Sequence, residues 1–403
     1  MRVSELWPVS DCSFLLFRWR GYTDHTKLLA PAASPYTLGQ LAAETFDPSG
    51  NEEGVRLLTV GFNASAWMHS LVNVFSWRQA GTGRSHEMDI IFRRLSALSR
   101  MLLHPYFVFD GPDCPQLKRG EDVVGSTSPR LLVQRFQELL LMFGFNWHTA
   151  SHFLYPPGEA EAELACLQSC KLIDVVVTPY NDALLFGATR VVRSDLHSGR
   201  FEDMQVYSSE AIEDCAGLEW GDLLLIMLMS SVDDDTGCRW CSEDVACQLV
   251  RYGFGRTLFQ AAITLQFVEF MEFVAKWRND VCEVLRTDPQ RLLGRRYHEL
   301  ARIIKEERIE FPDPAVLAMY LLPLTSWSDG GHPPVAFVTS RQPNLASLAT
   351  FCSQRLGWSL DTIQSRLIDA SAGAATRALL QVSLATILNM PVQPHRLSYT
   401  VPR

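Results

Sequence analysis

Residues 106–112 read Tyr106-Phe107-Val108-Phe109-Asp110-Gly111-Pro112, an apolar run that stops at an acidic residue and a turn. Two other short runs end in the same way: residues 57–62 are followed by Asn63, and residues 172–178 by a turn at 179–182. Short apolar runs that are rich in Val and Phe and bounded by polar residues are typical of buried strands. Each run therefore predicts a strand with a polar residue at its carboxyl end.

Segments of helical character lie between these runs, at residues 66–75, 88–103, 130–143 and 159–169. Strands that alternate with helices predict an α/β fold, in which helices cover both faces of a parallel sheet. In such sheets the ligand site lies beyond the carboxyl ends of the strands. The polar residues that end the strands are therefore expected to share one site.

The composition is that of a chain with a substantial core, since 47% of its 403 residues are hydrophobic and 20% are charged. The two most apolar stretches, residues 222–232 and 263–277, are too short or too interrupted by acids to span a membrane. No basic-then-apolar leader opens the chain, and ten cysteines without regular spacing indicate reduced thiols. The net charge of −9 opposes nucleic-acid binding unless acids and bases lie on separate surfaces.

Five acidic residues stand out at the ends of expected strands and helices: Asp110, Glu159, Glu161, Asp182 and Asp233. Carboxylates gathered at one edge repel one another unless cations lie among them, and their hard oxygen atoms favour Mg²⁺ or Mn²⁺. Two such ions, about 3.5–4 Å apart, can support the cleavage of a phosphodiester. Taken one at a time, each acid fits better as a solvated residue at a loop or helix end.

Three motifs give the acidic set a more specific meaning. Residues 108–112 with Lys118 and Arg119, residues 157–165 and residues 182–188 resemble the nuclease motifs of the flap endonuclease/XPG family. Within that family, residues 143–145 and 253–255 are similar to the GEN-type Holliday-junction resolvase branch, and the similarity extends from about Leu38 to Gln381.

The resemblance implies a PIN-like parallel sheet flanked by helices and followed by a helix–two-turn–helix region. It also implies a structure-specific endonuclease that acts in the nucleus on flap or four-way-junction DNA during repair. Two Mg²⁺ or Mn²⁺ ions would be held by Asp110, Glu159, Glu161, Asp182 and Asp233. Lys118 and Arg119 are expected to meet the scissile phosphate.

The same resemblance divides the chain into four parts, with residues 12–34 as extra sequence within the first. They are the N-terminal nuclease region, the internal nuclease region of the same α/β domain, the helix–two-turn–helix-like region and a C-terminal extension, at residues 1–125, 126–232, 233–310 and 311–403. Within the third part, residues 242–252 and 256–276 are the clearest helical segments.

The chain departs from the family at four places. Asn63 stands where the family's first strand ends in an aspartate, and Tyr180 replaces one of two aspartates in the internal motif. Arg2 replaces a glycine, and the glycine-rich loop at 237–242 carries Trp and Ser. Because two of seven negative charges are lost, two hypotheses follow. The chain is a metal-dependent endonuclease, or it is a catalytically impaired relative that serves as a nucleic-acid-binding or protein-interaction module.

Overall fold

The computed structural model describes residues 26–46, 56–75, 86–111, 129–150, 158–194, 201–230, 241–306, 311–328, 332–333 and 341–388. Seven strands form one sheet in the order β1-β7-β6-β5-β2-β3-β4. The strands are β1 (Ser34–Tyr36), β2 (Leu58–Asn63), β3 (Leu103–Phe109), β4 (Asn146–Thr149), β5 (Val175–Val177), β6 (Arg190–Ser194) and β7 (Met204–Ser208).

The centre of the sheet is parallel. Strand β2 pairs in parallel with β3 and with β5, and these pair in parallel with β4 and β6 respectively. Strands β7 and β1 are added antiparallel at one edge. The α/β fold and the three strands predicted from the apolar runs are confirmed. Strands β1, β4, β6 and β7 were not predicted, because β4 is only half-buried and the others are short and carry polar residues.

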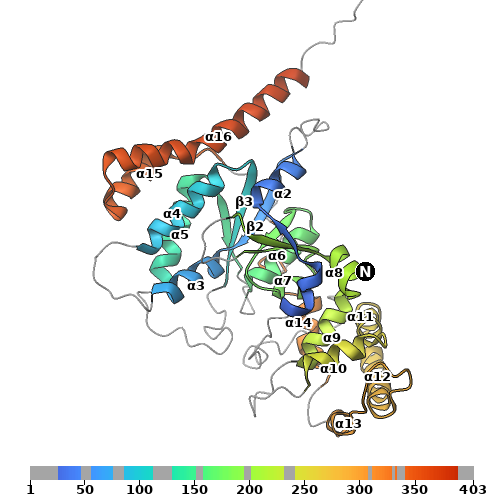
Figure 1. Cartoon of the computed structure of the whole chain (residues 1–403). Coiled ribbons are helices and arrows are strands. Elements are labelled where there is room, and N and C mark those ends of the chain that lie inside the picture. The colour runs from blue at the N-terminus through green and yellow to red at the C-terminus, as the bar shows by residue number, and fades with distance from the viewer. Residues whose placement is uncertain are drawn as a thin grey trace, which may run out of the picture.

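The described part of the chain contains sixteen α-helices, some of which cover the sheet while α10 to α13 lie beyond it at one end of the molecule (Figure 1). They are α1 (Thr26–Leu29), α2 (Leu38–Thr45), α3 (Ala64–Phe75), α4 (His86–Ser99), α5 (Pro129–Phe143), α6 (Ala160–Ser169), α7 (Asp182–Leu185), α8 (Ser209–Ala216), α9 (Trp220–Ser230), α10 (Glu243–Val250), α11 (Phe254–Thr264), α12 (Phe267–Thr287), α13 (His298–Lys305), α14 (Pro314–Leu321), α15 (Leu345–Phe351) and α16 (Leu360–Leu388).

Strand β3 shows how the two faces of the sheet are covered. Phe107 and Phe109 enter one hydrophobic cluster with residues of α3, α4 and α5. Tyr106 and Val108 enter a second cluster with residues of α6, α7 and α9. Because successive side chains of a strand point to opposite faces, a strand buried on both sides reads as one continuous apolar run. Residues 106–109 of β3 present that pattern.

The helices that follow the sheet differ from the prediction at one point. Residues 256–276 were expected to form a single helix, but the structure breaks there into α11 and α12. The break occurs at Leu265 and Gln266, where the Gln266 N–H donates to Glu269 Oε2 at 3.2 Å in a capping box. This reciprocal cap starts a new helix, and apolar spacing alone does not reveal it. Figure 1 shows α9 to α13 at the end of the molecule opposite α15 and α16.

The C-terminal helix α16 packs closely on α4. Ala370, Gly373 and Ala374 are buried on one face of α16, and the Ser99 hydroxyl at the end of α4 donates to the Ala370 carbonyl. One turn further on, Arg377 Nη1 donates to the carbonyls of Ser99 and Met101, at 3.3 and 2.7 Å. These carbonyls lie at the C-terminal end of α4 and just beyond it, where carbonyl groups have no N–H donor within the helix.

We expect Gly373→Val to destabilise the chain by about 1–3 kcal/mol, because a Cβ at this position would overlap the Ser99 carbonyl oxygen and the Arg100 backbone. Urea unfolding measures the change. Ala372→Val is the matched control, since Ala372 is exposed on the same helix and this substitution costs only helix propensity, about 0.5 kcal/mol. Equal destabilisation by the two variants would contradict the packing described for α16.

Two further expectations from the sequence concern the thiols and membrane spans, and they can be compared with the described residues. Their cysteines are free thiols: Cys166, Cys170, Cys215, Cys241, Cys247, Cys282 and Cys352. None of the described helices combines the length and hydropathy needed to cross a membrane. Most of the stretch taken as extra sequence, residues 12–25 of 12–34, lies outside the described part, as do Arg2 and most of the altered loop at 237–242.

Candidate active site

Asn63 links the end of β2 to the start of two helices. Its Oδ1 accepts a hydrogen bond from the Ala66 N–H at 2.8 Å, which caps α3. Its Nδ2 donates to Glu161 Oε1 on α6 at 2.6 Å, and both side chains are about 1% exposed. The neutral amide noted in the sequence therefore serves as a hydrogen-bond donor to one of the predicted metal ligands.

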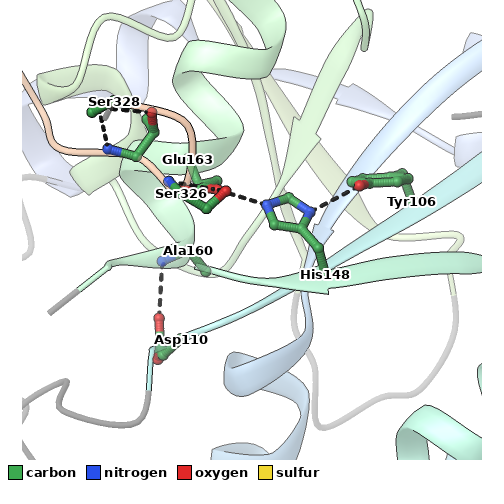
Figure 2. Close-up of polar contacts among 8 residues, drawn as sticks. Tyr106, Asp110, His148, Ala160, Glu163, Ser326 and Ser328 are labelled. Atoms are coloured by element: carbon green, nitrogen blue, oxygen red, sulfur yellow. Dashed lines mark hydrogen bonds and ion pairs between the residues drawn. The ribbon is translucent and has the colours of Figure 1, made fainter. Parts of the chain in front are cut away.

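Asp110, directly after β3, approaches α6 from the neighbouring strand. Its N–H donates to Ser65 Oγ at 2.8 Å, and its Oδ1 accepts from the Ala160 N–H at 3.0 Å (Figure 2). Glu159 occupies the N-cap position of α6 in an extended conformation and makes no side-chain capping bond. Asp110 thus supplies the cap from outside the helix, where its negative charge is also favoured by the helix dipole.

Two glycines let these segments approach one another. The Gly111 N–H donates to the Gly158 carbonyl at 2.9 Å. A Cβ at either glycine would collide with the Ala150 carbonyl oxygen. Because neither position has room for a side chain, the sequence must place glycine after Asp110 and before Glu159. The two motifs quoted from the sequence are therefore joined by backbone as well as by Asp110.

The segment that follows β5 contributes Thr178, Tyr180 and Asp182. Thr178 Oγ1 donates to Glu161 Oε1 at 3.3 Å and accepts from the Tyr180 N–H at 3.3 Å. Asp182 begins the short helix α7 and is 5% exposed. The Tyr180 side chain is half-buried and packs against the hydrophobic cluster on the α3–α5 face of the sheet. The phenol therefore gains apolar contacts in place of the carboxylate that the family pattern expects.

Four of the five predicted ligands lie at the carboxyl edge of β2, β3 and β5: Asp110, Glu159, Glu161 and Asp182. Asp233, Lys118 and Arg119 lie outside the described residues. Within the described residues no group of three or more His, Cys, Asp and Glu side chains is placed to hold a metal ion. Carboxylate oxygens that a cation would use already accept hydrogen bonds. Glu161 accepts from Asn63 and Thr178, and Asp110 accepts from the Ala160 N–H.

A second acidic residue of α6, Glu163, belongs to a different network. It is fully buried and accepts a bond from His148 Nε2 on β4 at 2.7 Å. Its carboxylate also accepts from the Ser326 N–H, at 3.0 Å to Oε2, and from the Ser326 hydroxyl. Figure 2 shows Glu163 between Ser326 and His148, with Tyr106 on the far side of the imidazole. Glu163 therefore anchors residues 311–328 to the sheet.

The proton pattern of this network follows from its donors and acceptors. Tyr106 Oη lies 2.8 Å from His148 Nδ1, and the imidazole tautomer that donates to Glu163 through Nε2–H can accept from the phenol through Nδ1. Burial, followed by the nearby charge of Glu163, raises the pKa of Tyr106 above its ordinary range. Burial and the same carboxylate raise the pKa of Cys166 to about 12. Both groups therefore stay protonated at neutral pH.

Sequence reasoning did not assign a role to Glu163, although it lies in a quoted motif. Glu161 and Glu163 are two residues apart on α6, so their side chains leave the helix in nearly opposite directions. Only one of the two can therefore face the strand ends. The partner that explains Glu163, Ser326, is 163 residues away in the chain, and no local pattern reveals such a contact.

Comparisons with known proteins point to one group of nucleases. The XPG I-region profile matches residues 152–233. The DNA repair protein rad13 of Schizosaccharomyces pombe is 26% identical over 249 residues, which are 60% of this chain and 20% of that protein. Flap endonuclease GEN-like 1 of Arabidopsis thaliana is 29% identical over 176 residues, which are 38% of this chain and 28% of the plant protein. The chain thus spans well under half the length of these relatives.

Solved structures share the fold. The Holliday junction-resolving enzyme GEN1, in complex with product DNA and a Mg²⁺ ion, matches with a TM-score of 0.67 and 24% identity over 89% of this chain and 79% of that one. The catalytic core of Rad2 in complex with DNA substrate matches with a TM-score of 0.59 and 21% identity, over 87% of this chain and all of that one. The sheet and its flanking helices are therefore of the kind that was predicted.

Proposed function

The chain belongs to the XPG/flap endonuclease family, with its GEN-like branch among the similar proteins, and we propose from this premise that it is a divalent-metal-dependent endonuclease that cuts branched DNA. The relatives include DNA repair proteins of eukaryotes, so the proposed place of action is the nucleus and the proposed role is DNA repair or recombination.

One observation carries the proposal, namely the set of carboxylates where the three parallel strands end. Asp110, Glu161 and Asp182 come from different segments, and hydrogen bonds through Ala160, Asn63 and Thr178 hold the first two in place around the start of α6. Ligand sites of parallel α/β sheets lie at this edge. Asn63, Glu161 and Asp182 are all buried at this edge, which suits a site that must keep its shape.

The donor set fits a hard divalent cation, because every proposed ligand offers carboxylate oxygen. We propose Asp110, Glu159, Glu161, Asp182 and Asp233 as the residues that hold it, with two ions as the family pattern suggests. A bound divalent ion supplies Lewis-acid stabilisation of the charge that develops on the phosphodiester. Asn63 already donates to Glu161 Oε1 at 2.6 Å, so the ion would share this carboxylate with the amide.

Other residues contribute order rather than charge. Thr178 and Asn63 fix the orientation of Glu161, and the Ala160 N–H fixes that of Asp110.

Lys118 and Arg119 are proposed to bind the scissile phosphate, since cations placed there neutralise its negative charge. Tyr180 contributes no ligand, so the chain works with fewer negative charges than the family pattern provides.

Cleavage of labelled DNA tests the proposal. The substrates are a 5′ flap, a splayed arm, a four-way junction and a linear duplex of matched sequence, each with Mg²⁺, with Mn²⁺ and with EDTA. We expect incision near the branch point in Mg²⁺ or Mn²⁺ only, and none of the linear duplex. Asp182→Asn, which removes one charge while keeping the side-chain shape, is expected to stop the incision and so excludes a contaminating nuclease.

Two outcomes would contradict the proposal in different ways. Binding of branched DNA without incision would identify the chain as a non-catalytic binding module, the second hypothesis drawn from the sequence. Absence of both binding and incision would reject branched DNA as the partner.

A further inference from the structure

The loop between α12 and α13 concentrates positive charge in a chain whose net charge is −9. Residues 286–297 contain four arginines, Arg286, Arg291, Arg295 and Arg296, and a single acid, Asp288. Arg291, Arg295 and Arg296 are exposed. Within the described part of the chain none of these three guanidinium groups makes an ion pair, whereas neighbouring Arg302 is paired with Glu299 and Glu306. The loop therefore presents uncompensated positive charge to solvent.

The backbone of this loop is held in an unusual conformation. Asp288 has a φ of 47°, Arg291 a φ of 58° and Gly294 a φ of 70°. Only glycine adopts such angles without strain, and a non-glycine residue there costs about 1–3 kcal/mol. Two strained residues within four positions persist only when the surrounding structure fixes them. Strain of this kind concentrates at binding and catalytic sites.

Asp288 and Tyr252 supply that fixation. The Tyr252 hydroxyl, from the turn between α10 and α11, donates to Asp288 Oδ1 at 2.6 Å. The same carboxylate oxygen accepts from the Leu293 N–H at 3.1 Å, and the Gln290 N–H donates to the Tyr252 hydroxyl at 3.2 Å. Leu293 is buried beneath the loop. The one acidic side chain of the loop is thus engaged in holding it together, and its single negative charge leaves a net positive charge on the four arginines.

One arginine is also oriented before any ligand binds. The guanidinium of Arg295 lies over the Tyr297 ring, 4.8 Å from its centroid. Such stacking reduces the freedom of a long side chain and leaves the N–H groups at the guanidinium edge able to donate. A guanidinium edge matches the geometry of a phosphate group, which can accept two parallel hydrogen bonds. A rigid, strained loop that carries three such groups fits a polymer with regularly spaced phosphates.

We propose that residues 288–297 bind the phosphate backbone of a duplex arm of the DNA, through Arg291, Arg295 and Arg296. This inference rests on the proposed function and adds a second contact region beside the carboxylate edge. The loop lies at the end of the molecule that carries α12 and α13, away from α15 and α16 (Figure 1). Arginine contacts of this kind position DNA without reading its sequence. They also explain how an acidic chain could hold a polyanion, since this loop carries a local net positive charge although the net charge of the chain is −9.

DNA binding without cleavage tests the inference. Fluorescence anisotropy with a labelled 5′-flap DNA in Ca²⁺ is measured across a salt series for the unaltered chain and for R291Q/R295Q/R296Q. We expect the Kd of the triple variant to rise at least about tenfold near 0.1 M salt, and the salt slope to fall by about 2–3, one for each lost phosphate contact. The control, R93Q/R355Q/R366Q, changes the net charge equally, at exposed Arg93 of α4, exposed Arg355 of the 352–356 turn and half-buried Arg366 of α16. It is expected to bind as the unaltered chain does.

The outcomes separate this inference from the proposed function. Tight binding by the unaltered chain with an unchanged Kd and salt slope in the loop variant would overturn the inference alone. Equal weakening by the loop variant and the control would overturn it as well, because the effect would then be one of net charge. Failure of the unaltered chain to bind would overturn both. Unfolding midpoints that agree among the three proteins show that the loop variant is folded. Tyr252→Phe removes the bond to Asp288 but no charge, so it is expected to weaken binding less than the triple variant does.

Discussion

We expect Glu163→Ala to lower the free energy of unfolding by about 3–5 kcal/mol, one of the largest effects available from a single side chain of this molecule. Glu163 is fully buried and accepts hydrogen bonds from His148 Nε2, the Ser326 N–H and the Ser326 hydroxyl. Alanine would leave all three donors inside the protein without their acceptor and would open a cavity. Both changes destabilise a core strongly.

Urea unfolding measures this effect, and two variants calibrate it. Glu163→Gln keeps the shape and one acceptor oxygen but directs an NH₂ group toward donors, so we expect an intermediate loss of about 1–3 kcal/mol. Glu213→Ala on α8 is the matched control, since that glutamate is exposed on a helix and its loss should change stability by about 0.5 kcal/mol or less. A Glu163→Ala value within the range of the control would contradict the network shown in Figure 2.

The same variant has a local consequence that a general loss of stability does not explain. Ser326 belongs to residues 311–328, which reach the sheet through Glu163. Amide hydrogen exchange at Ser326 should therefore speed up more in Glu163→Ala than exchange within β2 or β3. Uniform acceleration across the chain would indicate that Glu163 acts on the core as a whole and does not anchor that segment.

The central sheet could be predicted from the sequence because its signals are local. Residues 106–109 are apolar at every position, which a strand buried on both faces requires, and Asp110 marks where it ends. The edge strands lack such a signal, since β4 is half-buried throughout and β1 has three residues. The break between α11 and α12 was missed because apolar residues continue through it, while the capping box at Gln266 depends on side-chain geometry.

The sequence named candidate site residues but could not show the contacts among them. Motif spacing identified Asp110, Glu159, Glu161 and Asp182, and the parallel strands place them at one edge of the sheet. The sequence also identified Asn63 as a departure from the family pattern. It could not show that the Asn63 amide donates to Glu161, because that bond joins residues 98 positions apart. The four-part division of the chain stays a prediction, as do the metal-ligand and phosphate-binding roles of the whole set: Asp110, Glu159, Glu161, Asp182, Asp233, Lys118 and Arg119.

The Asn63–Glu161 bond leads to the second large effect, which concerns metal binding. The Asn63 Nδ2 donates to a buried oxygen of Glu161 at 2.6 Å. The partial positive charge of this N–H group therefore faces the carboxylate, as the charge of a bound cation would. We expect Asn63→Asp to lower the free energy of unfolding by about 2–4 kcal/mol in EDTA, because two buried carboxylates would then face each other without a cation. The Ala66 cap can persist, since aspartate keeps the Oδ1 acceptor.

Divalent ions should reverse that loss. An ion that binds the folded variant and not the unfolded chain stabilises it by about 2.7 kcal/mol at a concentration one hundred times its Kd. Thermal unfolding with increasing Mg²⁺ or Mn²⁺ should therefore raise the Tm of Asn63→Asp more than that of the unaltered chain. Asn63→Ala is the control, because it removes the same bond without adding charge and should gain no additional response to the ions. If Asn63→Asp responds no more than this control does, Glu161 does not lie at an ion site. A stronger response would mean that the amide now takes the place of a cation beside Glu161, and that one change of charge restores a ligand the family pattern contains.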